Sequence, residues 1–288
     1  MSQLANKVAF ITGAGAGIGR GIACDLASVG VKICVADLDL VRAEDTVAEI
    51  SDNGGQAIAV FCNTANEDHQ KAAAHRCISV FGGIDIAVAN AGISRNGSIL
   101  ELTLDEWQRQ VDVNLTGVFL TAQIAARQMI EQGRGGRIIC ISSLRAIKTG
   151  AAVWSYSALK AAITVMVRGW AQELGPRGIT SNAIGPGLIE TPLASGLVGE
   201  IGSAIRREVE ERIPAGRVGQ PADIARAVRF LVDPGADYVN GSFIIVDGGL
   251  RDAPDASVLS KEIEAERSAH NSLAQSMRER MNHNLDLR

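Results

Sequence analysis

The chain contains 288 residues, of which 47% are hydrophobic and 21% are charged, and its formal net charge at pH 7 is −4. This length and apolar content allow a large core, and we expect one α/β domain rather than two smaller ones. The acidic balance provides no basic field for nucleic acid or an anionic membrane, no run is long enough to cross a bilayer, and no cleavable leader precedes Lys7. We therefore expect a cytoplasmic protein that binds neither nucleic acid nor membrane.

The cysteines and histidines argue against disulfide bonds and metal chemistry. The five cysteines stand singly, mostly in apolar runs, without the spacing of a zinc site or a disulfide framework. They are Cys24, Cys34, Cys62, Cys77 and Cys140. The four histidines, in polar segments away from every motif described below, are His69, His75, His270 and His283. We expect no metal site.

A glycine-rich turn follows the first predicted strand. The apolar run at 8–12 fits a buried parallel strand, and it leads into a turn with Gly13, Gly17 and Gly19, followed by a helix over 18–28. Such a strand, turn and helix present free backbone N–H groups and the positive helix end to a pyrophosphate. The turn therefore predicts a dinucleotide site, although a tight connection without a ligand would also be rich in glycine.

An acidic residue ends the second predicted strand, which covers 31–36. Asp37 stands at the position where dinucleotide-binding proteins place a carboxylate for the adenosine ribose hydroxyls. A carboxylate there repels a 2′-phosphate, and the glycine turn, with Ala16 in its centre, contains no arginine or lysine to bind one. We therefore expect NAD rather than NADP. The alternative role for Asp37 is to cap the next helix.

The middle of the chain continues the alternation of strands and helices. Helices are predicted over 42–51, 67–81 and 104–130, and strands over 57–61 and 84–89. Asn90 and Gly92 follow the second of these strands in a turn. Asn114 stands in an apolar part of the long helix, where its amide needs hydrogen-bond partners. A purely structural asparagine would have the same appearance in the sequence.

The strand predicted over 137–142 ends beside Ser143. Tyr156 and Lys160 follow on a helix, and because they are four residues apart their side chains share one face. A nearby ammonium favours the phenolate, so Lys160 could lower the pKa of Tyr156. Tyr156 could then exchange a proton with a carbinol oxygen to which Ser143 donates. Ser142 is excluded because neighbouring strand positions point to opposite faces. Taken alone, a tyrosine and a lysine at this spacing also fit an ordinary helix with an aromatic side chain at its edge and a solvated lysine beside it.

Loops dominate the chain after the strand predicted over 179–184. A Gly-Pro-Gly turn leads to Leu188, Ile189 and Thr191. The segment 193–214 is rich in small and apolar residues, and it would form a lid over a substrate.

Seven predicted strands, the last over 242–246, alternate with helices. This pattern predicts a Rossmann-type doubly wound parallel sheet with helices on both faces in a single domain, and it places the motifs at the carboxyl ends of the strands.

We assign 1–250 to this domain and 251–288 to a C-terminal extension. The extension begins with a linker-like stretch, and its apolar residues then recur at roughly helical spacing, which predicts an amphipathic helix that docks on its own or a neighbouring subunit. These residues are Leu259, Ile263, Ala269, Leu273, Met277 and Met281. A frayed tail is the alternative.

The motifs, in this order, resemble those of the short-chain dehydrogenase/reductase family. The resemblance spans roughly residues 7–249 and rests on Thr12-Gly13-x-x-x-Gly17-x-Gly19, Asp37, Asn90-Ala91-Gly92, Asn114, Ser143, Tyr156-Ser157-Ala158-Leu159-Lys160 and the Pro186-Gly187 loop. Two positions depart from the family pattern. Ala89 replaces the first residue of an Asn-Asn-Ala-Gly turn, and Asn63 stands where the family usually has aspartate.

The resemblance implies roles for individual residues. Tyr156 would be the general acid/base, Lys160 would lower its pKa and bind the nicotinamide ribose, and Ser143 would polarise the substrate oxygen. The backbone of Asn114 would hold a water that completes a proton path. The implied cofactor contacts are Gly13, Gly17, Ile18, Gly19, Asp37, Asn63, Asn90, Gly92, Tyr156, Lys160, Ile189 and Thr191. Substrate contacts are expected from Ser143, Arg145, Trp154 and Leu188.

The expected function is that of an NAD-dependent oxidoreductase that interconverts a secondary alcohol and a ketone. A homo-oligomer is expected, because the family commonly forms tetramers. Arg95 or Arg145 could bind a substrate anion, the alternative being a solvated surface arginine. One rival hypothesis is a catalytically silent sensor or scaffold that binds NAD(H). A second rival is an epimerase or dehydratase that recycles its nicotinamide.

Overall fold

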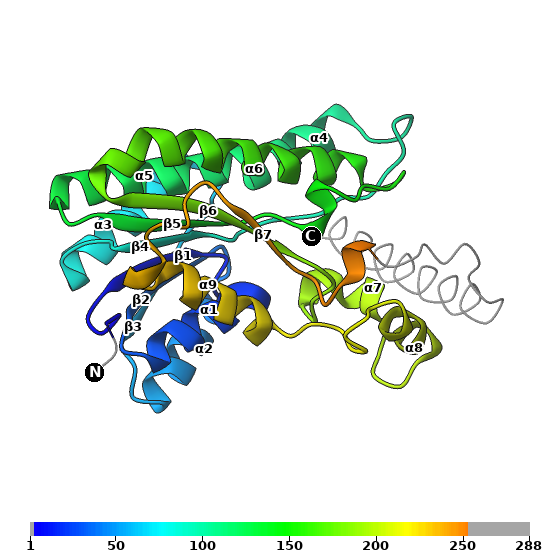
Figure 1. Ribbon diagram of the computed structural model, residues 1–288, viewed down its shortest axis with the longest axis horizontal. Coiled ribbons are helices and arrows are strands. Elements are labelled where there is room, and N and C mark those ends of the chain that lie inside the picture. The colour runs from blue at the N-terminus through cyan, green and yellow to red at the C-terminus, as the bar shows by residue number, and fades with distance from the viewer. Residues whose placement is uncertain (1–2, 253–288) are drawn as a thin grey trace, which may run out of the picture.

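The computed structural model describes residues 3–252, and within them the chain forms one seven-stranded parallel sheet (Figure 1). The strand order is β3-β2-β1-β4-β5-β6-β7. The strands are β1 Val8–Thr12, β2 Lys32–Asp37, β3 Ala57–Phe61, β4 Ile86–Ala89, β5 Gly136–Ile141, β6 Ile179–Pro186 and β7 Phe243–Val246. This order reverses direction between β1 and β4, which confirms the predicted doubly wound fold.

Helices cover both faces of the sheet. They are α1 Gly17–Ser28, α2 Leu40–Asp52, α3 Glu67–Phe81, α4 Leu104–Val111, α5 Gly117–Gln132, α6 Trp154–Leu174, α7 Ser195–Val198, α8 Ala204–Glu211 and α9 Pro221–Val232. Figure 1 shows α3, α5 and α6 on one face and α1, α2 and α9 on the other. The short helices α7 and α8 lie beyond the carboxyl ends of β6 and β7.

Two apolar cores hold these layers together, one on each side of the sheet. One core joins alternate strand residues to α1 and α9, and the other joins the intervening strand residues to α3, α5 and α6. All of β1 is buried, with Phe10 and Ile11 fully inaccessible. Burial on both faces explains why the strands are continuously apolar rather than alternating.

Polar residues fix where several helices begin. The Asp39 side chain accepts a hydrogen bond from the backbone of Arg42 at the start of α2. Asn66 caps α3 in the same way, and Thr103 and Glu106 form a reciprocal capping box on α4. The cap of α2 is therefore Asp39 and not Asp37, which removes the alternative role considered for Asp37.

The structure differs from the sequence prediction in the long helix expected over 104–130. A π-helical turn, Asp112–Thr116, separates α4 from α5. The predicted lid at 193–214 contains α7 and α8, whose apolar residues form a small cluster of their own. The extension predicted over 251–288 lies almost wholly outside the described residues.

Three further features of residues 3–252 bear on function. No helix in this part of the chain is long and apolar enough to cross a membrane. No group of potential metal ligands gathers among these residues. All five cysteines are free thiols.

Candidate active site

The predicted site residues gather at the carboxyl ends of the strands, around the reversal between β1 and β4. Asn90, which follows β4, joins the two strands. Its Nδ2 donates to the carbonyl oxygens of Thr12 and Gly13, both at 3.0 Å, and its backbone N–H donates to the Thr12 hydroxyl at 3.2 Å. In open α/β sheets, such a reversal is where ligands bind.

The glycine turn after β1 forms one wall of this site. Gly13 has a φ of +64°, a conformation that other residues rarely adopt. At Gly19, a Cβ atom would lie only 2.1 Å from the Gly13 carbonyl oxygen, so the turn can pack against α1 only without a side chain there. Ala16 precedes α1 and provides no side-chain cap. The N–H groups of the first helical turn are therefore suited to a pyrophosphate.

Asp37 lies against the same turn at the end of β2. Its Oδ2 accepts a hydrogen bond from the backbone N–H of Gly15 at 2.8 Å, and its Oδ1 accepts from Asp39 at 3.0 Å. The side chain of Arg42 also approaches Gly15, since a Cβ there would lie 2.9 Å from the Arg42 Cβ. Arg42 pairs with Asp39 at 3.2 Å. The sequence analysis missed this arginine because it lies outside the glycine turn.

Two other expected cofactor contacts are positioned by local hydrogen bonds. The side-chain oxygen of Asn63, Oδ1, accepts a hydrogen bond from the backbone N–H of Ala65 at 3.1 Å, so part of the hydrogen-bonding capacity of this amide serves its own turn. The Thr191 hydroxyl accepts from Ala194 at 3.3 Å and thereby caps a short turn. The Thr191 methyl lies 3.1 Å from where a Cβ on Gly17 would be, opposite the glycine turn.

Ser143, Tyr156 and Lys160 come together between β5 and α6. The Ser143 hydroxyl accepts from the backbone N–H of Arg145 at 3.1 Å, and its proximity to the Tyr156 phenol lowers the pKa of that group. The Lys160 Nζ lies 5.6 Å from the centre of the Tyr156 ring and donates to the Ile141 carbonyl oxygen at 2.8 Å. The Ser142 hydroxyl instead donates to the Lys160 carbonyl oxygen at 2.7 Å, away from Tyr156.

Burial sets the proton affinities of this cluster. It raises the pKa of Tyr156, against the hydrogen bond from Ser143 and the charge of Arg145, which both lower it. Burial also lowers the pKa of Lys160 to about 8. Desolvation thus outweighs the nearby charges in this structure, and the expected lowering of the tyrosine pKa by Lys160 stays a prediction.

The π-helical turn places the Asn114 side chain next to the same cluster. Asn114 is fully buried, and its amide forms two hydrogen bonds with the backbone of Ile93, at 2.9 and 3.0 Å. A Cβ atom on Gly92 would lie 2.9 Å from the Asn114 Oδ1 and 3.5 Å from the Lys160 Nζ. Gly92 therefore occupies the gap between these two side chains.

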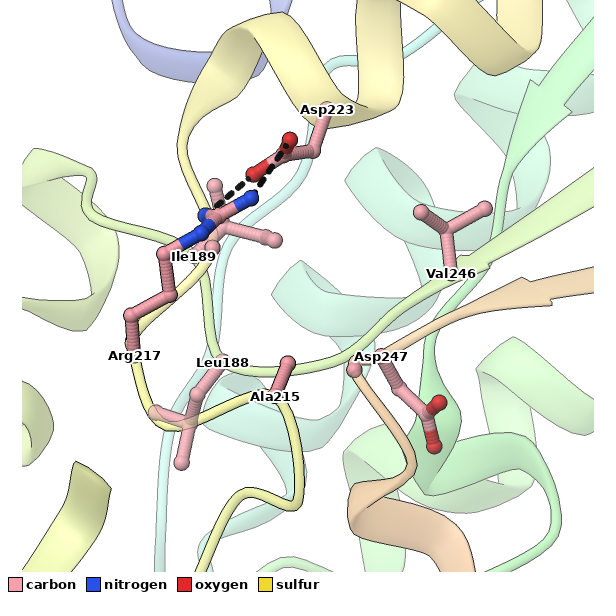
Figure 2. Close-up of a pocket in the computed structure, with 9 residues that line it drawn as sticks. Leu188, Ile189, Ala215, Arg217, Asp223, Val246 and Asp247 are labelled. Carbon is pink, nitrogen blue, oxygen red and sulfur yellow. Dashed lines mark hydrogen bonds and ion pairs between the residues drawn. The ribbon is translucent and has the colours of Figure 1, made fainter. Parts of the chain in front are cut away.

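A pocket of about 230 Å³ lies beside the loop after β6 (Figure 2). Leu188 and Ile189 line it together with Ala215, Val246 and Gly248, among other residues. Figure 2 shows the Arg217 guanidinium facing the Asp223 carboxylate at one side of the pocket, with nitrogen to oxygen distances of 2.7 and 3.0 Å. Neither Ser143 nor Tyr156 lines this pocket, so only Leu188 and Ile189 connect it to the expected contacts.

Trp154 stacks on Trp107 of α4, with ring centres 5.9 Å apart. Its indole nitrogen is buried without a hydrogen-bond partner among the described residues. Gln110, fully buried on α4, links the Arg95 backbone to the Ser155 hydroxyl, at 3.2 and 3.3 Å. The sequence analysis missed Gln110, because a glutamine in an amphipathic helix has no distinguishing local signal.

The two arginines considered for anion binding differ in their surroundings. Arg95 forms an ion pair with Glu106, at 2.8 Å between Nε and Oε1. No carboxylate within residues 3–252 pairs with Arg145, whose Nη1 donates to the Lys148 carbonyl oxygen at 3.4 Å. Arg95 is therefore already neutralised.

Comparisons with known proteins agree with this geometry. The family described as enoyl-(acyl carrier protein) reductase matches residues 13–251. A 3-oxoacyl-[acyl-carrier-protein] reductase of Synechocystis sp. is 40% identical over 252 residues, which cover 87% of this chain and 99% of that protein. An L-rhamnose 1-dehydrogenase (NAD(P)(+)) of Azotobacter vinelandii is 37% identical over 251 residues, covering 86% of this chain and 97% of that protein.

Solved structures give the same result. The crystal structure of a short-chain type dehydrogenase/reductase from Mycobacterium marinum has a TM-score of 0.80 and 37% identity, covering 86% of this chain and 96% of the other. The fold and site thus define an α/β oxidoreductase that binds a nicotinamide cofactor. The chain belongs to the short-chain dehydrogenase/reductase family.

Proposed function

We propose that the protein is an NAD-dependent oxidoreductase that interconverts a secondary alcohol and a ketone, with Tyr156 as the general acid/base. The observation that carries this proposal is the arrangement of Ser143, Tyr156 and Lys160. The Ser143 side chain lowers the pKa of the phenol, and the Lys160 Nζ lies 5.6 Å from the centre of the phenol ring, one helical turn further along the same face. A carbinol oxygen placed at the phenol would meet both hydroxyl groups.

Each residue has a distinct role in the proposed oxidation. Bound NAD would supply the acceptor for the hydride that leaves the carbinol carbon. Tyr156 accepts the hydroxyl proton, and Ser143 donates a hydrogen bond to the same oxygen as it becomes a carbonyl. Protonated Lys160 stabilises the tyrosinate. The backbone of Asn114 holds the water through which the proton continues to solvent.

The preference for NAD rests on Asp37. Its carboxylate lies against the glycine turn, where it would accept from ribose hydroxyls and repel a 2′-phosphate. The nearby Arg42 is the group that would favour NADP, but its charge is engaged by Asp39. The relative named for L-rhamnose oxidation carries NAD(P)(+) in its name, so relatives do not decide between the cofactors.

The proposed cofactor and substrate contacts follow the same geometry. The cofactor would lie along the glycine turn, Asp37 and Asn63, and reach Asn90, Gly92, Ile189 and Thr191 near the reacting ring. The substrate would contact Ser143, Arg145, Trp154 and Leu188. A homotetramer is proposed for the assembly.

The first test is to follow NADH formation from a panel of alcohols with NAD or NADP. The panel contains simple secondary alcohols, polyols, hydroxysteroids and hydroxy acids, and acetoacetyl-thioester reduction is included because a relative is named for that chemistry. We expect Tyr156→Phe to lower turnover by about 10²–10⁴-fold while NADH binding persists, since the phenylalanine retains the ring and loses only the proton-transfer group. Turnover that survives in this variant would contradict the assignment.

One observation favours the rival sensor or scaffold. Burial raises the pKa of Tyr156 instead of lowering it, so this arrangement alone does not produce a tyrosinate at neutral pH. A sensor would bind NADH in both wild type and Tyr156→Phe and oxidise nothing in the panel. Net NADH production from an alcohol would exclude both this rival and an enzyme that only recycles its nicotinamide.

A further inference from the structure

Arg145 lies at the edge of the reaction centre. It follows Ser143 by two residues, and its backbone N–H donates to the Ser143 hydroxyl at 3.1 Å. Its Nη1 lies 3.4 Å from the Lys148 carbonyl oxygen and 3.8 Å from where a Cβ on Gly150 would be. The guanidinium therefore rests on the loop that connects Ser143 to the helix of Tyr156.

The charge of Arg145 has no acidic partner in the described part of the chain. Other arginines around the site do have one. Arg95 pairs with Glu106, Arg206 with Glu190 and Glu210, and Arg217 and Arg226 with Asp223. Arg145 thus differs from these arginines: its Nη1 donates to the Lys148 carbonyl oxygen, while its Nε and Nη2 have no partner among the described residues. Such a planar pair of donors matches the two oxygens of a carboxylate.

A second observation connects this free charge to the reacting group. The charge of Arg145 lowers the pKa of Tyr156 through space. The geometry agrees, because the backbone N–H of Arg145 donates to the Ser143 hydroxyl and its guanidinium rests on the loop that leads to the helix of Tyr156. Apolar residues adjoin this cluster along the chain: Leu144 is buried beside Ser143, and Trp154 begins the helix of Tyr156. A cation without an acidic partner beside apolar side chains suits a molecule that is apolar apart from one acid group.

We propose that the substrate is a hydroxy acid, or the corresponding keto acid, whose carboxylate pairs with Arg145 while its carbinol faces Ser143 and Tyr156. This inference rests on the proposed function of the same site. It adds the chemical class of the substrate, and it assigns Arg145 rather than Arg95 to the anion.

The direct test measures binding without turnover. Tyr156→Phe protein saturated with NAD is titrated in a calorimeter with 3-hydroxybutyrate, 3-hydroxyoctanoate and cholate, and with the methyl ester of each. We expect at least one acid to bind about tenfold more tightly than its ester, and less so at high salt. Adding Arg145→Gln should remove this preference, Arg145→Lys should retain part of it, and Arg95→Gln should retain all of it.

Two results would overturn the inference. One is an acid-to-ester affinity ratio that Arg145→Gln does not change, and the other is a panel in which no acid binds better than its ester. A preference lost equally in Arg95→Gln and Arg145→Gln would also contradict it, because the effect would then be a general property of the surface charge.

Turnover separates this inference from the proposed function. With Tyr156 intact, Arg145→Gln should lower the acid-to-ester ratio of kcat/KM by about tenfold. The ratio cancels any effect of Arg145 on the tyrosine, since both substrates use the same phenol. Tyrosine-dependent turnover without an advantage for acids would leave the dehydrogenase and remove the hydroxy-acid assignment. Binding of acids through Arg145 without any oxidation would instead support the carboxylate site and contradict the proposed dehydrogenase.

Discussion

Lys160 carries a charge that its surroundings disfavour. It is 2% exposed, and burial lowers its pKa from 10.5 to about 8. Each unit of pKa difference between the folded and unfolded states corresponds to about 1.4 kcal/mol, so a protonated Lys160 costs the fold up to about 3 kcal/mol. The hydrogen bond from Nζ to Ile141 returns about 1 kcal/mol of this. Lys160 therefore stabilises the proposed reaction at the expense of the fold.

Lys160→Met should reveal this cost as a pH dependence. Between pH 8 and 10.5 the unfolded lysine holds a proton that the folded one has lost, so wild-type stability rises with pH in this window. The variant has no lysine at this position, so its stability does not show this rise with pH. At pH 7 its free energy of unfolding should exceed that of wild type by about 1–2 kcal/mol, and the advantage should vanish or reverse by pH 10.5. Urea denaturation of both proteins across this range measures the difference, and parallel curves would contradict it.

Asp37 should control which dinucleotide the protein accepts. In Asp37→Ser, the loss of a charged acceptor should lower kcat/KM for NAD by about tenfold, and removal of the repulsion should raise kcat/KM for NADP. Because Arg42 lies beside the same turn, a 2′-phosphate admitted there would compete with Asp39 for its guanidinium. Adding Arg42→Ala should abolish the gain with NADP but not the loss with NAD. An unchanged cofactor ratio in Asp37→Ser would refute the NAD assignment.

At the scale of elements, an ion pair joins α8 to the loop after β6 that contains the proposed cofactor contacts Ile189 and Thr191. The Arg206 side chain is 8% exposed and contacts Glu190 at 3.2 Å and Glu210 at 2.6 Å. Gln220 also donates to Glu190, at 2.7 Å, and together Gln220 and Arg206 lower the pKa of Glu190. Glu190 stands between Ile189 and Thr191, so the Arg206–Glu190 pair connects α8 directly to these proposed cofactor contacts.

Glu190→Gln should therefore loosen both α8 and the loop after β6. We expect KM for NAD to rise about fivefold, a modest figure because Glu190 is partly exposed, and backbone amide exchange to accelerate across 192–213. Glu210→Gln is the matched control, since it breaks the pair within α8 and leaves the pair between the two elements. Equal effects of the two variants would show that Arg206 only stabilises its own helix.

The regular elements were largely predictable, because parallel strands are continuously apolar and helix ends carry caps. The predicted strand at 57–61 and helix at 67–81 have the bounds found in the structure. The π-helical turn Asp112–Thr116 was not predictable, because a change in helical register has no residue signal of its own. The only indication was Asn114, a polar residue in an apolar stretch.

The site was predictable where spacing along one element decides the geometry, as for Tyr156 and Lys160. It was not predictable where two distant segments meet. The ion pair of Arg95 with Glu106 and the bridge made by Gln110 depend on how the loop after β4 folds back on α4. Whether the pKa of Tyr156 lies above or below its ordinary value also depends on burial, which the sequence does not specify for a single residue.

For the whole molecule, we expect a homotetramer. Apolar side chains remain exposed on the outer helices, including Phe119 on α5, 40% exposed, and Val165 on α6, 59% exposed. Light scattering at micromolar concentration should give four times the chain mass, and Val165→Glu should lower it because the charge cannot be buried in an apolar interface. Val80→Glu on α3 is the control, with a similar exposed valine. A wild-type monomer would contradict the assembly.

The reversal of strand order divides the molecule into two halves with separate tasks. The half from β1 to β3 provides the glycine turn and Asp37, and the half from β4 onwards provides Ser143, Tyr156 and Lys160. The halves meet at the β1–β4 ladder, through Asn90, and where α9 packs on α1. Under the proposed function, the first half sets the nucleotide preference and the second half sets the substrate preference, so the two preferences can evolve independently. A chimera that exchanges only the first half would inherit the donor's dinucleotide preference and keep the recipient's substrate preference, provided that these contacts between the two halves are preserved.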